Sequence, residues 1–545
     1  MTSELIDVTK EIAKRFTNEQ VNPYTDKSEL KALIKEINSF DLGDKVHHSI
    51  IAGEEYKGDE IFEAINPNKP AQVIGRFSRF GTKPKAIEYL LYRANQASKQ
   101  FYRLPLSKRA DALRSIAQVL RERKRKLDAA LILSGKNPLE ADADTCEGID
   151  FPEYYALELE VLLGDHLTPS KDTYRKLVHK PWGSVVCANP FNFAVAIESG
   201  QDNLSLAGAN SAISKPSLHT PHCGLLVYQV AQEGLRRAGI QIPGLVNLII
   251  GGAQEMQALL KSDNIKGYCY TGSLKGALEI KQIVLSPNGP GYRVQPIASE
   301  HNGVNAIIIL NDADPQSAVE ASTISLIGNS GQKCSKDSWI IAEEAIYSQV
   351  RDGLVSRLAK VKVGPVIPTL EGYNDYGALI SKQALEKALM QIEEFKQKGA
   401  QVIFGENPLI DHPDKGYLMK PVLLEVSPQV LYQHPELRDI EIFAPVAAIV
   451  KAKNLEEAII FEKMSHFALT GGIFTNSKEA INSWLGQSDV GNKYINRKIT
   501  GALVGQTFGT NASSWSGLGG IKGAGGPYTV LRAVRQESLV GYLRI

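Results

Sequence analysis

Short apolar runs rich in β-branched residues alternate with segments of helical periodicity from about residue 183 onward. The first runs are GSVVCANP (183–190), ANSAISKP (209–216) and IKGYCYTGS (265–273), and a second series begins at 304–310. Strands that alternate with helices are typical of parallel sheets, because each parallel connection needs a crossover. The pattern therefore predicts two α/β domains that meet near residue 300.

The chain before this alternation is expected to be mainly helical. Apolar residues recur at helical spacing within 1–60 and again from 84 to 164, where Gly135 and Pro138 supply a helix stop. We interpret residues 1–60 as a helical N-terminal arm. The Gly-rich segment 513–527, near the other end of the chain, is expected to be a loop.

The net charge is close to zero, since 61 Lys and Arg residues face 60 Asp and Glu residues, which leaves +1. Proteins that coat nucleic acid or anionic membranes need a basic face, so neither partner is expected. The longest uncharged apolar runs are far shorter than the roughly 20 residues of a membrane helix, and the N-terminus resembles no leader peptide. These features indicate a cytoplasmic protein with a small-molecule substrate, or a matrix protein if the chain is a processed mitochondrial one.

Cys334 is the strongest candidate nucleophile. It lies in GNSGQKCSK (328–336), a small polar turn in which Gly331 gives access and Lys333 is expected to lower the pKa of the thiol. The five cysteines are widely spaced without a CxxC pair, which argues against a disulfide framework and predicts no metal site. Four of them lie in apolar or helical contexts and are interpreted as structural: Cys146, Cys187, Cys223 and Cys269.

Two further side chains could act with this thiol. Glu300 opens the second α/β series, and a carboxylate near a thiol can serve as general base for a water. Asn192 follows the first strand in PFNF (190–193), where its amide could donate to an oxyanion. The structural alternatives are a surface charge for Glu300 and a turn residue for Asn192.

The ends of two predicted strands carry residues suited to a phosphate-containing ligand. Lys215 ends one strand, and Gly272-Ser273 ends the next. Ligands of open α/β sheets bind outside the carboxyl ends of the strands. A lysine there can meet phosphate or ribose, and a helix that starts at a Gly-Ser turn can face a pyrophosphate.

Together these segments resemble the aldehyde dehydrogenase superfamily. The marks, in family order, are PFNF with Asn192, the strand-end Lys215, TGS at 271–273, Glu300, GQKC at 331–334 and EIFAPV at 441–446. The separations 215 − 192 = 23 and 334 − 300 = 34 also agree with the family pattern. The resemblance covers roughly residues 60–530. It implies an α/β fold with a Rossmann-like NAD-binding domain, an α/β catalytic domain and a small oligomerisation arm.

The resemblance also implies a role for each position. Cys334 would attack the aldehyde carbon, Asn192 would stabilise the oxyanion, and Glu300 would activate the water that hydrolyses a thioester. The implied cofactor is NAD, with NADP as the alternative. Its implied ligands are Lys215, Gly272, Ser273, Glu441 and Phe443, the last two on the nicotinamide side.

Within the superfamily, the chain is most similar to the glutamate semialdehyde (1-pyrroline-5-carboxylate) dehydrogenases of proline catabolism. The similarity is carried by EADADTCEGIDFPEYYA (140–156), SGQKCS (330–335), GNKYINRKITGALVGQ (491–506) and KGAGGP (522–527). It implies oxidation of L-glutamate γ-semialdehyde to L-glutamate. The implied substrate contacts are Ser335, Gly501 and Ala502 for the α-carboxylate, Phe508 and Phe193 for the rest of the chain, and Glu147 at the other end.

Three departures from the family pattern bear on this expectation. Asn302 stands where a glycine usually lets the nicotinamide approach, and Leu218 stands where many NAD-preferring relatives have a glutamate for the adenine ribose. FGTNASSWSG (508–517) replaces a shorter Gly-rich segment, so the loop 509–521 would reshape the substrate entrance.

The expected domain boundaries follow. Residues 61–164 and 181–298 form the dinucleotide-binding domain, 299–498 the catalytic domain, and 165–180 with 499–545 the oligomerisation arm and substrate-anchor segment of a homodimer or larger homo-oligomer. Three alternatives remain. They are an aldehyde dehydrogenase for another semialdehyde or a simple aldehyde, a non-catalytic dinucleotide-binding paralogue, and a cysteine hydrolase, for which no Cys/His dyad spacing is evident.

Overall fold

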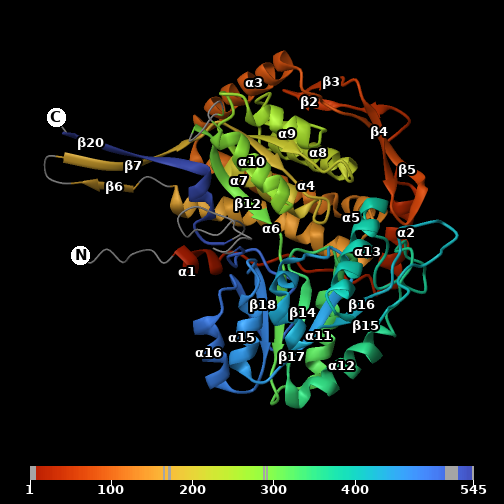
Figure 1. Ribbon diagram of the computed structural model, residues 1–545. Helices are drawn as coiled ribbons and strands as arrows, with labels where there is room; N and C mark the ends of the chain where they lie inside the picture. Colours follow the sequence, from red (N-terminus) through yellow and green to blue (C-terminus); the bar gives the residue numbers. More distant parts are fainter. Residues whose placement is uncertain are drawn as a thin grey trace.

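The computed structural model describes residues 8–163, 166–169, 173–286, 289, 293–509 and 526–542. Two seven-stranded sheets form the centres of two lobes, and a three-stranded sheet projects from one side (Figure 1). Most of the loop 509–521 and most of KGAGGP lie outside the described residues. In the described part of the chain, no helix combines the length and apolar character needed to cross a membrane.

The first sheet has the strand order β12-β11-β8-β9-β10-β2-β3. Its parallel strands are β8 (Ser184–Ala188), β9 (Ser211–Lys215), β10 (Val246–Leu248), β11 (Gly267–Gly272) and β12 (Gln295–His301). The crossover helices are α7 (Ala196–Ala207), α8 (Pro221–Arg237), α9 (Ala253–Leu260) and α10 (Leu274–Leu285). Every residue of β8 and β9 is buried, as expected for a parallel sheet covered on both faces.

The second sheet has the order β15-β16-β17-β14-β13-β18-β19. Its strands are parallel except for the edge strand β15, which is antiparallel. They are β13 (Asn305–Ile309), β14 (Asp337–Glu343), β15 (Gln401–Phe404), β16 (Val422–Glu425), β17 (Val446–Ala452), β18 (Thr470–Phe474) and β19 (Asn492–Ile495). The helices of this lobe are α11 (Pro315–Ile327), α12 (Glu344–Leu358), α13 (Lys382–Gln397), α14 (Pro428–Gln433), α15 (Leu455–Lys463) and α16 (Lys478–Gln487). The predicted α/β fold is therefore confirmed.

The N-terminal region is helical only in part. Helices α1 (Val8–Ala13) and α2 (Lys27–Asn38) agree with the expected helical arm, but strands follow within the same 60 residues. The strands β2 (Ser49–Ile51) and β3 (Glu54–Tyr56) extend the first sheet with antiparallel pairing. A smaller sheet contains β1 (Val46–His47), β4 (Ile61–Asn66) and β5 (Lys69–Ser78). The difference arises because β2 and β3 are only three residues long, and because β2 joins the first sheet through β10, which local periodicity does not reveal.

Four helices lie between β5 and the projecting sheet: α3 (Pro84–Tyr102), α4 (Leu106–Glu122), α5 (Lys124–Leu133) and α6 (Pro138–Leu162). Helix α6 begins with Asn137, whose side chain accepts a hydrogen bond from the Glu140 N–H at 2.8 Å, and with a proline at the first position. It lies near the junction of the two lobes and is mostly buried (Figure 1). Its polar residues are therefore held inside the protein, where each needs a partner.

The projecting sheet is antiparallel, with the order β20-β7-β6. It contains β6 (His166–Pro169), β7 (Thr173–Pro181) and β20 (Val534–Tyr542) (Figure 1). The short helix η4 (Thr529–Ala533) leads into β20. The sheet thus joins the two segments that we expect to form an oligomerisation arm.

Candidate active site

Cys334 follows a tight turn at the end of α11. Three consecutive residues, Asn329, Ser330 and Gly331, have φ values of 51°, 56° and 70°. A Cβ at Gly331 would lie 2.2 Å from the backbone of Ala444, so only glycine fits there. This left-handed turn ends the helix abruptly and leaves Cys334 half-buried, whereas the other four cysteines are buried.

The backbone of Cys334 is fixed from the second sheet. The side chain of Asn305, at the start of β13, donates hydrogen bonds to the carbonyl oxygens of Cys334 (2.7 Å) and Lys336 (2.8 Å). Gly303 packs so closely that a Cβ there would lie 2.0 Å from the Cys334 carbonyl oxygen. The sequence analysis missed Asn305, because no motif distinguishes an asparagine at the start of a strand.

Asn192 reaches the same turn from the first lobe. It lies between β8 and α7 and is 6% exposed. Its amide nitrogen donates to the Gln332 carbonyl oxygen at 3.1 Å, and its own carbonyl accepts from the Asn329 amide at 3.2 Å. A carboxamide nitrogen carries two hydrogens, so one can remain on Gln332 while the other points to an oxyanion.

Glu300 comes from β12, where it is paired in register with Thr271 of β11. Its carboxylate lies close enough to Cys334 to raise the pKa of the thiol. It also opposes the lowering of the Arg532 pKa, which is due to burial of that guanidinium in η4. The first sheet thus supplies Glu300, the second supplies Cys334, and the site lies between the two.

The expected lowering of the Cys334 pKa by Lys333 is wrong. Burial raises the pKa of the thiol to about 12, and the negative charges of Glu300, Glu441 and Glu147 add to the effect. Lys333 instead forms an ion pair with Glu140 at 2.5 Å. The thiol is therefore protonated at neutral pH, and its proton must leave as the nucleophile attacks.

Ion pairs on one face of α6 border the site. Burial raises the pKa of Glu147 to about 8, with repulsion from Asp144 and Asp150 adding to it. The Lys136 ammonium lies 3.0 Å from Asp144 and 4.2 Å from the centroid of the Phe193 ring. The sequence analysis missed Glu140 and Asp144, although 140, 144 and 147 have the spacing of a single helix face.

The expected cofactor residues lie at the carboxyl ends of the strands. Lys215, the last residue of β9, is 7% exposed and donates from Nζ to the Gly251 carbonyl at 3.1 Å. Burial lowers its pKa to about 8, while Glu255 and other carboxylates oppose the shift. The Ser273 hydroxyl accepts from the Gly276 N–H at 3.2 Å and caps α10. These residues belong to the first sheet and not to the turn that carries Cys334.

Glu441, another expected cofactor residue, lies close to the nucleophile. Its carboxylate accepts from the Gly303 N–H at 3.0 Å, and burial raises its pKa to about 7. Since Gly303 also contacts the Cys334 carbonyl, the three residues are contiguous. Phe443 lies edge-to-face with Phe191, with their ring centroids 6.1 Å apart.

The expected cofactor residues have the chemical character needed to bind a dinucleotide. Lys215 provides a buried cation at a strand end, and Glu441 provides a carboxylate that can accept from ribose hydroxyls. At Gly272, a Cβ would lie 2.5 Å from the Tyr270 hydroxyl oxygen, so a side chain at this position would displace Tyr270. Glu441 adjoins Cys334 through Gly303, where the chemistry would occur.

The departure at Asn302 has a structural explanation. Its φ of 49° lies in the left-handed region, which asparagine tolerates better than most residues. Its side-chain oxygen accepts a hydrogen bond from the Leu274 N–H at 2.8 Å in the first turn of α10. Asn302 therefore keeps the backbone shape of a glycine and caps a helix. Leu218, the second departure, packs near Gly252 at the start of α9.

The expected carboxylate-binding residues occupy two segments. Ser335 is 8% exposed and follows the nucleophile, and its carbonyl accepts from the Thr470 hydroxyl at 3.4 Å. Gly501 is exposed, with φ 79°, in the loop that follows β19. Ala502 and Phe508 are half-buried in the same loop. The role of these residues in substrate binding stays a prediction.

Comparison with known proteins agrees with this geometry. The model of the aldehyde dehydrogenase family matches residues 54–534. A 1-pyrroline-5-carboxylate dehydrogenase of Geobacillus sp. (strain WCH70) is 30% identical over 525 residues, which cover 95% of this chain and 97% of the relative. The 1-pyrroline-5-carboxylate dehydrogenase 2 of Bacillus subtilis (strain 168) is 28% identical, with 90% and 92% covered.

A solved structure shows that the fold is also similar. The 1-pyrroline-5-carboxylate dehydrogenase from Thermus with bound NAD superposes with a TM-score of 0.87 at 28% identity, over 96% of this chain and 99% of that one. The family model covers most of the chain and the relatives match nearly all of it, so the chain belongs to the aldehyde dehydrogenase family.

Proposed function

We propose that the protein oxidises L-glutamate γ-semialdehyde to L-glutamate with NAD as the oxidant. The observation that carries the proposal is the convergence of Cys334, Glu300 and Asn192 from both lobes on one turn. Relatives that bear the name 1-pyrroline-5-carboxylate dehydrogenase match nearly the whole chain and support the substrate. The related Thermus enzyme with bound NAD supports the cofactor.

The first step forms a covalent bond between the Cys334 sulfur and the aldehyde carbon. The thiol proton passes to solvent water as the sulfur attacks, and Glu300, the carboxylate whose charge acts most strongly on that thiol, is left unprotonated for the hydrolysis step. The carbonyl oxygen becomes an oxyanion, which can accept hydrogen bonds from the Asn192 amide and the Cys334 backbone N–H. The product of this step is a thiohemiacetal.

When bound, the dinucleotide supplies the hydride acceptor that converts this thiohemiacetal into a thioester. Lys215, Ser273, Glu441 and Phe443 would hold it in place. Glu300 then removes a proton from a water molecule, and the resulting hydroxide attacks the thioester carbon. The carbon–sulfur bond breaks, the carboxylic acid leaves, and the sulfur of Cys334 is free for another cycle.

Specificity for the substrate rests on its α-carboxylate. The Ser335 hydroxyl and the backbone N–H groups of Gly501 and Ala502 would donate to it, because successive N–H groups around a left-handed glycine form an anion site. Phe508 and Phe193 would line the aliphatic chain, and Glu147 would face the other polar end. An aldehyde without the carboxylate would leave these donors unpaired.

Replacing Asn192 by alanine is expected to lower kcat by about 10²- to 10³-fold, since one oxyanion donor is worth roughly 3 kcal/mol. The KM for NAD should stay within about twofold, because Asn192 contacts the Cys334 turn and not the strand-end residues. Steady-state NADH formation measures both constants. Asn189→Ala is the matched control, since this buried neighbour bonds the Cys187 carbonyl instead and should keep kcat. Equal losses in both variants would contradict the oxyanion role.

The raised pKa of Cys334 predicts a pH-dependent reactivity of the free enzyme. Only the thiolate reacts with iodoacetamide, and a pKa of about 12 leaves most of the thiol protonated at pH 7. The alkylation rate should therefore rise about tenfold per pH unit between pH 7 and 9. Mass spectrometry of the Cys334 peptide measures this rate. A rate that is already constant above pH 7 would show a thiol with a low pKa instead.

A substrate panel tests the proposed activity directly. NADH formation from glutamate semialdehyde is compared with that from succinate semialdehyde and propanal, each with NAD and with NADP. The proposal expects the highest kcat/KM for glutamate semialdehyde with NAD. Higher kcat/KM for propanal or succinate semialdehyde would favour the alternative substrate class, and NAD binding without turnover would favour a non-catalytic paralogue.

Two further properties belong to the same proposal. We propose a homodimer or larger homo-oligomer in which the β20-β7-β6 sheet forms the contact arm, because this sheet projects from the two lobes (Figure 1). We also propose a cytoplasmic location, which suits five free thiols in the chain.

A further inference from the structure

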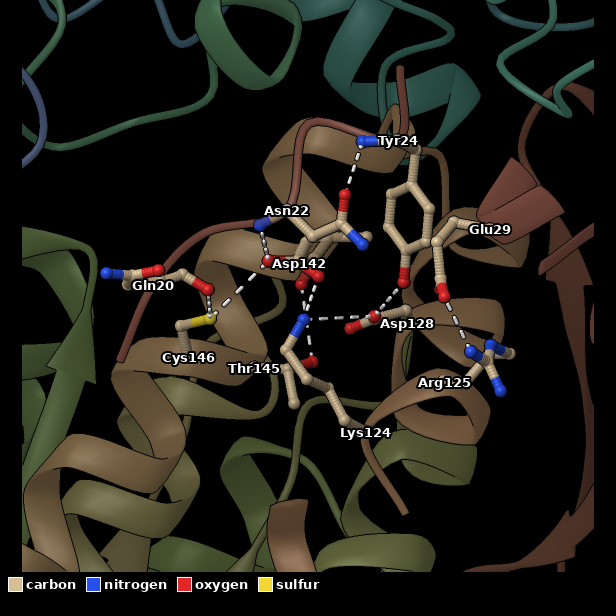
Figure 2. Close-up of polar contacts among 11 residues, drawn as sticks. Gln20, Asn22, Tyr24, Glu29, Lys124, Arg125, Asp128, Asp142, Thr145 and Cys146 are labelled. Atoms are coloured by element: carbon tan, nitrogen blue, oxygen red, sulfur yellow. Dashed lines mark hydrogen bonds and ion pairs between the residues drawn. The ribbon is translucent and has the colours of Figure 1, made fainter. Parts of the chain in front are cut away.

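The segment 16–24, between α1 and α2, lies along one face of α6 and is called the arm segment below. Three contacts fix it to residues of α6 that are spaced one helical turn apart. They are Glu19 N–H to Asp150 (2.8 Å), Cys146 Sγ to the Gln20 carbonyl (3.5 Å) and Asn22 N–H to Asp142 (2.7 Å). Figure 2 shows the last two of these contacts. Since 142, 146 and 150 lie on one helix face, the arm segment follows the helix axis.

The end of the arm segment is held by buried charge. The Tyr24 hydroxyl donates to Asp128 at 2.7 Å, and Lys124 forms ion pairs with both Asp142 and Asp128 (Figure 2). Both carboxylates are fully buried. Buried charges of this kind tolerate little displacement, because separating them leaves a charge without compensation. The arm segment is therefore tied to one position on α6.

A different face of α6 carries the residues that interact with the catalytic turn. Glu140 pairs with Lys333, next to Cys334, and Glu147 contributes to the raised pKa of that thiol. The arm segment and the active site therefore contact the same helix from different faces. A contact between the arm segment and residues 501–505, the loop proposed to bind the substrate carboxylate, would connect these two faces of the helix.

Asn18 makes that contact. Its amide nitrogen donates to the Asp150 carboxylate at 2.9 Å and to the Val504 carbonyl at 3.0 Å, which uses both of its hydrogens. Phe16 supports the same loop, since its ring lies 3.6 Å from the Cβ position of Gly505. The segment 501–505, which contains Gly501 and Ala502, is called the anchor loop below.

We propose that Asn18 is a positioning residue for substrate recognition: it holds the anchor loop against α6 so that its N–H groups meet the substrate carboxylate. The inference rests on the proposed function. The anchor loop has glycines with φ of 79° and 97° at its two ends, Gly501 and Gly505, and glycine restricts the backbone less than other residues. External contacts must therefore fix it, and Asn18 provides two hydrogen bonds from one side chain.

The test separates recognition of the carboxylate from the chemistry. Asn18→Asp keeps the shape of the side chain but removes both hydrogens, and Asn18→Ala removes the side chain. Each variant should raise the KM for glutamate semialdehyde by about 10- to 100-fold, because small displacements of binding groups have effects of this size. The kcat should stay within about twofold, and both constants for propanal, which has no carboxylate, should stay unchanged.

Asn22→Ala is the matched control in the same arm segment. Among the described residues, the Asn22 side chain accepts from the Tyr24 N–H at 2.8 Å, and the contact of Asn22 with α6 comes from its backbone. This variant should keep all constants. Phe16→Ala removes a second contact between the arm segment and the anchor loop and should reproduce the selective rise in KM, which keeps the inference testable if Asn18 variants fold poorly.

Two results would overturn the inference. An unchanged KM for glutamate semialdehyde in folded Asn18 variants would show that the anchor loop is held by other contacts. An equal rise for propanal would show a general structural role. The wild-type preference for glutamate semialdehyde over propanal tests the proposed function separately, because it does not depend on any change at Asn18.

Discussion

Replacing Cys334 by alanine is expected to lower kcat by at least about 10⁴-fold, because the variant cannot form the covalent intermediate. The fold should persist, since the side chain is half-buried and the turn is held through backbone groups. NADH formation from glutamate semialdehyde measures the loss, and NAD binding measured by calorimetry should be retained.

The other cysteines provide the control for this experiment. Cys269 lies in β11, fully buried in the first sheet, and Cys269→Ala should keep most of the activity. Turnover by Cys334→Ala at more than one per cent of the wild-type rate would exclude Cys334 as the nucleophile. It would direct attention to a mechanism in which the aldehyde reacts as its hydrate.

The second large effect is expected for Glu300→Gln, with a fall of about 10²- to 10⁴-fold in steady-state turnover. Glutamine keeps the shape but cannot take a proton from water, so the thioester should accumulate. Rapid mixing should therefore show a burst of NADH close to one equivalent per active site, followed by a slow phase. The trapped acyl group on Cys334 should be visible by mass spectrometry of the denatured protein.

Glu147→Gln separates this role from a general effect of negative charge. Both carboxylates raise the pKa of Cys334, but Glu147 belongs to α6 and is proposed to face the substrate. Its variant should change the KM for the substrate and show no burst. If Glu300→Gln also shows no burst, with both phases slowed equally, Glu300 assists the attack of the thiol and is not limited to hydrolysis.

The sequence predicts the parallel sheets well, because buried parallel strands form continuous apolar runs that any window detects. It predicts less for β2 and β3, which are short antiparallel strands at a sheet edge. The strands β16 and β19 were not expected either, and both lie in the second sheet. Each of them has only four residues, so a local pattern gives little information about it.

In the candidate site too, features that depend on nearby residues in the sequence are predicted, and features that depend on distant residues are not. Cys334, Asn192 and Glu300 stand in recognisable motifs, and the resemblance to the family names them as candidates. The pKa of Cys334 was predicted wrongly because it depends on carboxylates at positions 147, 300 and 441, which only the fold brings together. Lys333, the neighbour in sequence, is turned away to Glu140. Proximity along the chain was therefore a poor guide to electrostatics.

The nucleophile and the proposed base stand on different sheets, and this arrangement has a consequence for the lifetime of the acyl-enzyme. Cys334 is bonded to β13 through Asn305, and Glu300 is part of β12. A small shift of one lobe against the other would leave each sheet intact. It would lengthen the distance between the Glu300 carboxylate, which activates water, and the thioester on Cys334. The survival time of the thioester therefore depends on the alignment of the two lobes, and the deacylation rate of the enzyme is a measure of that alignment.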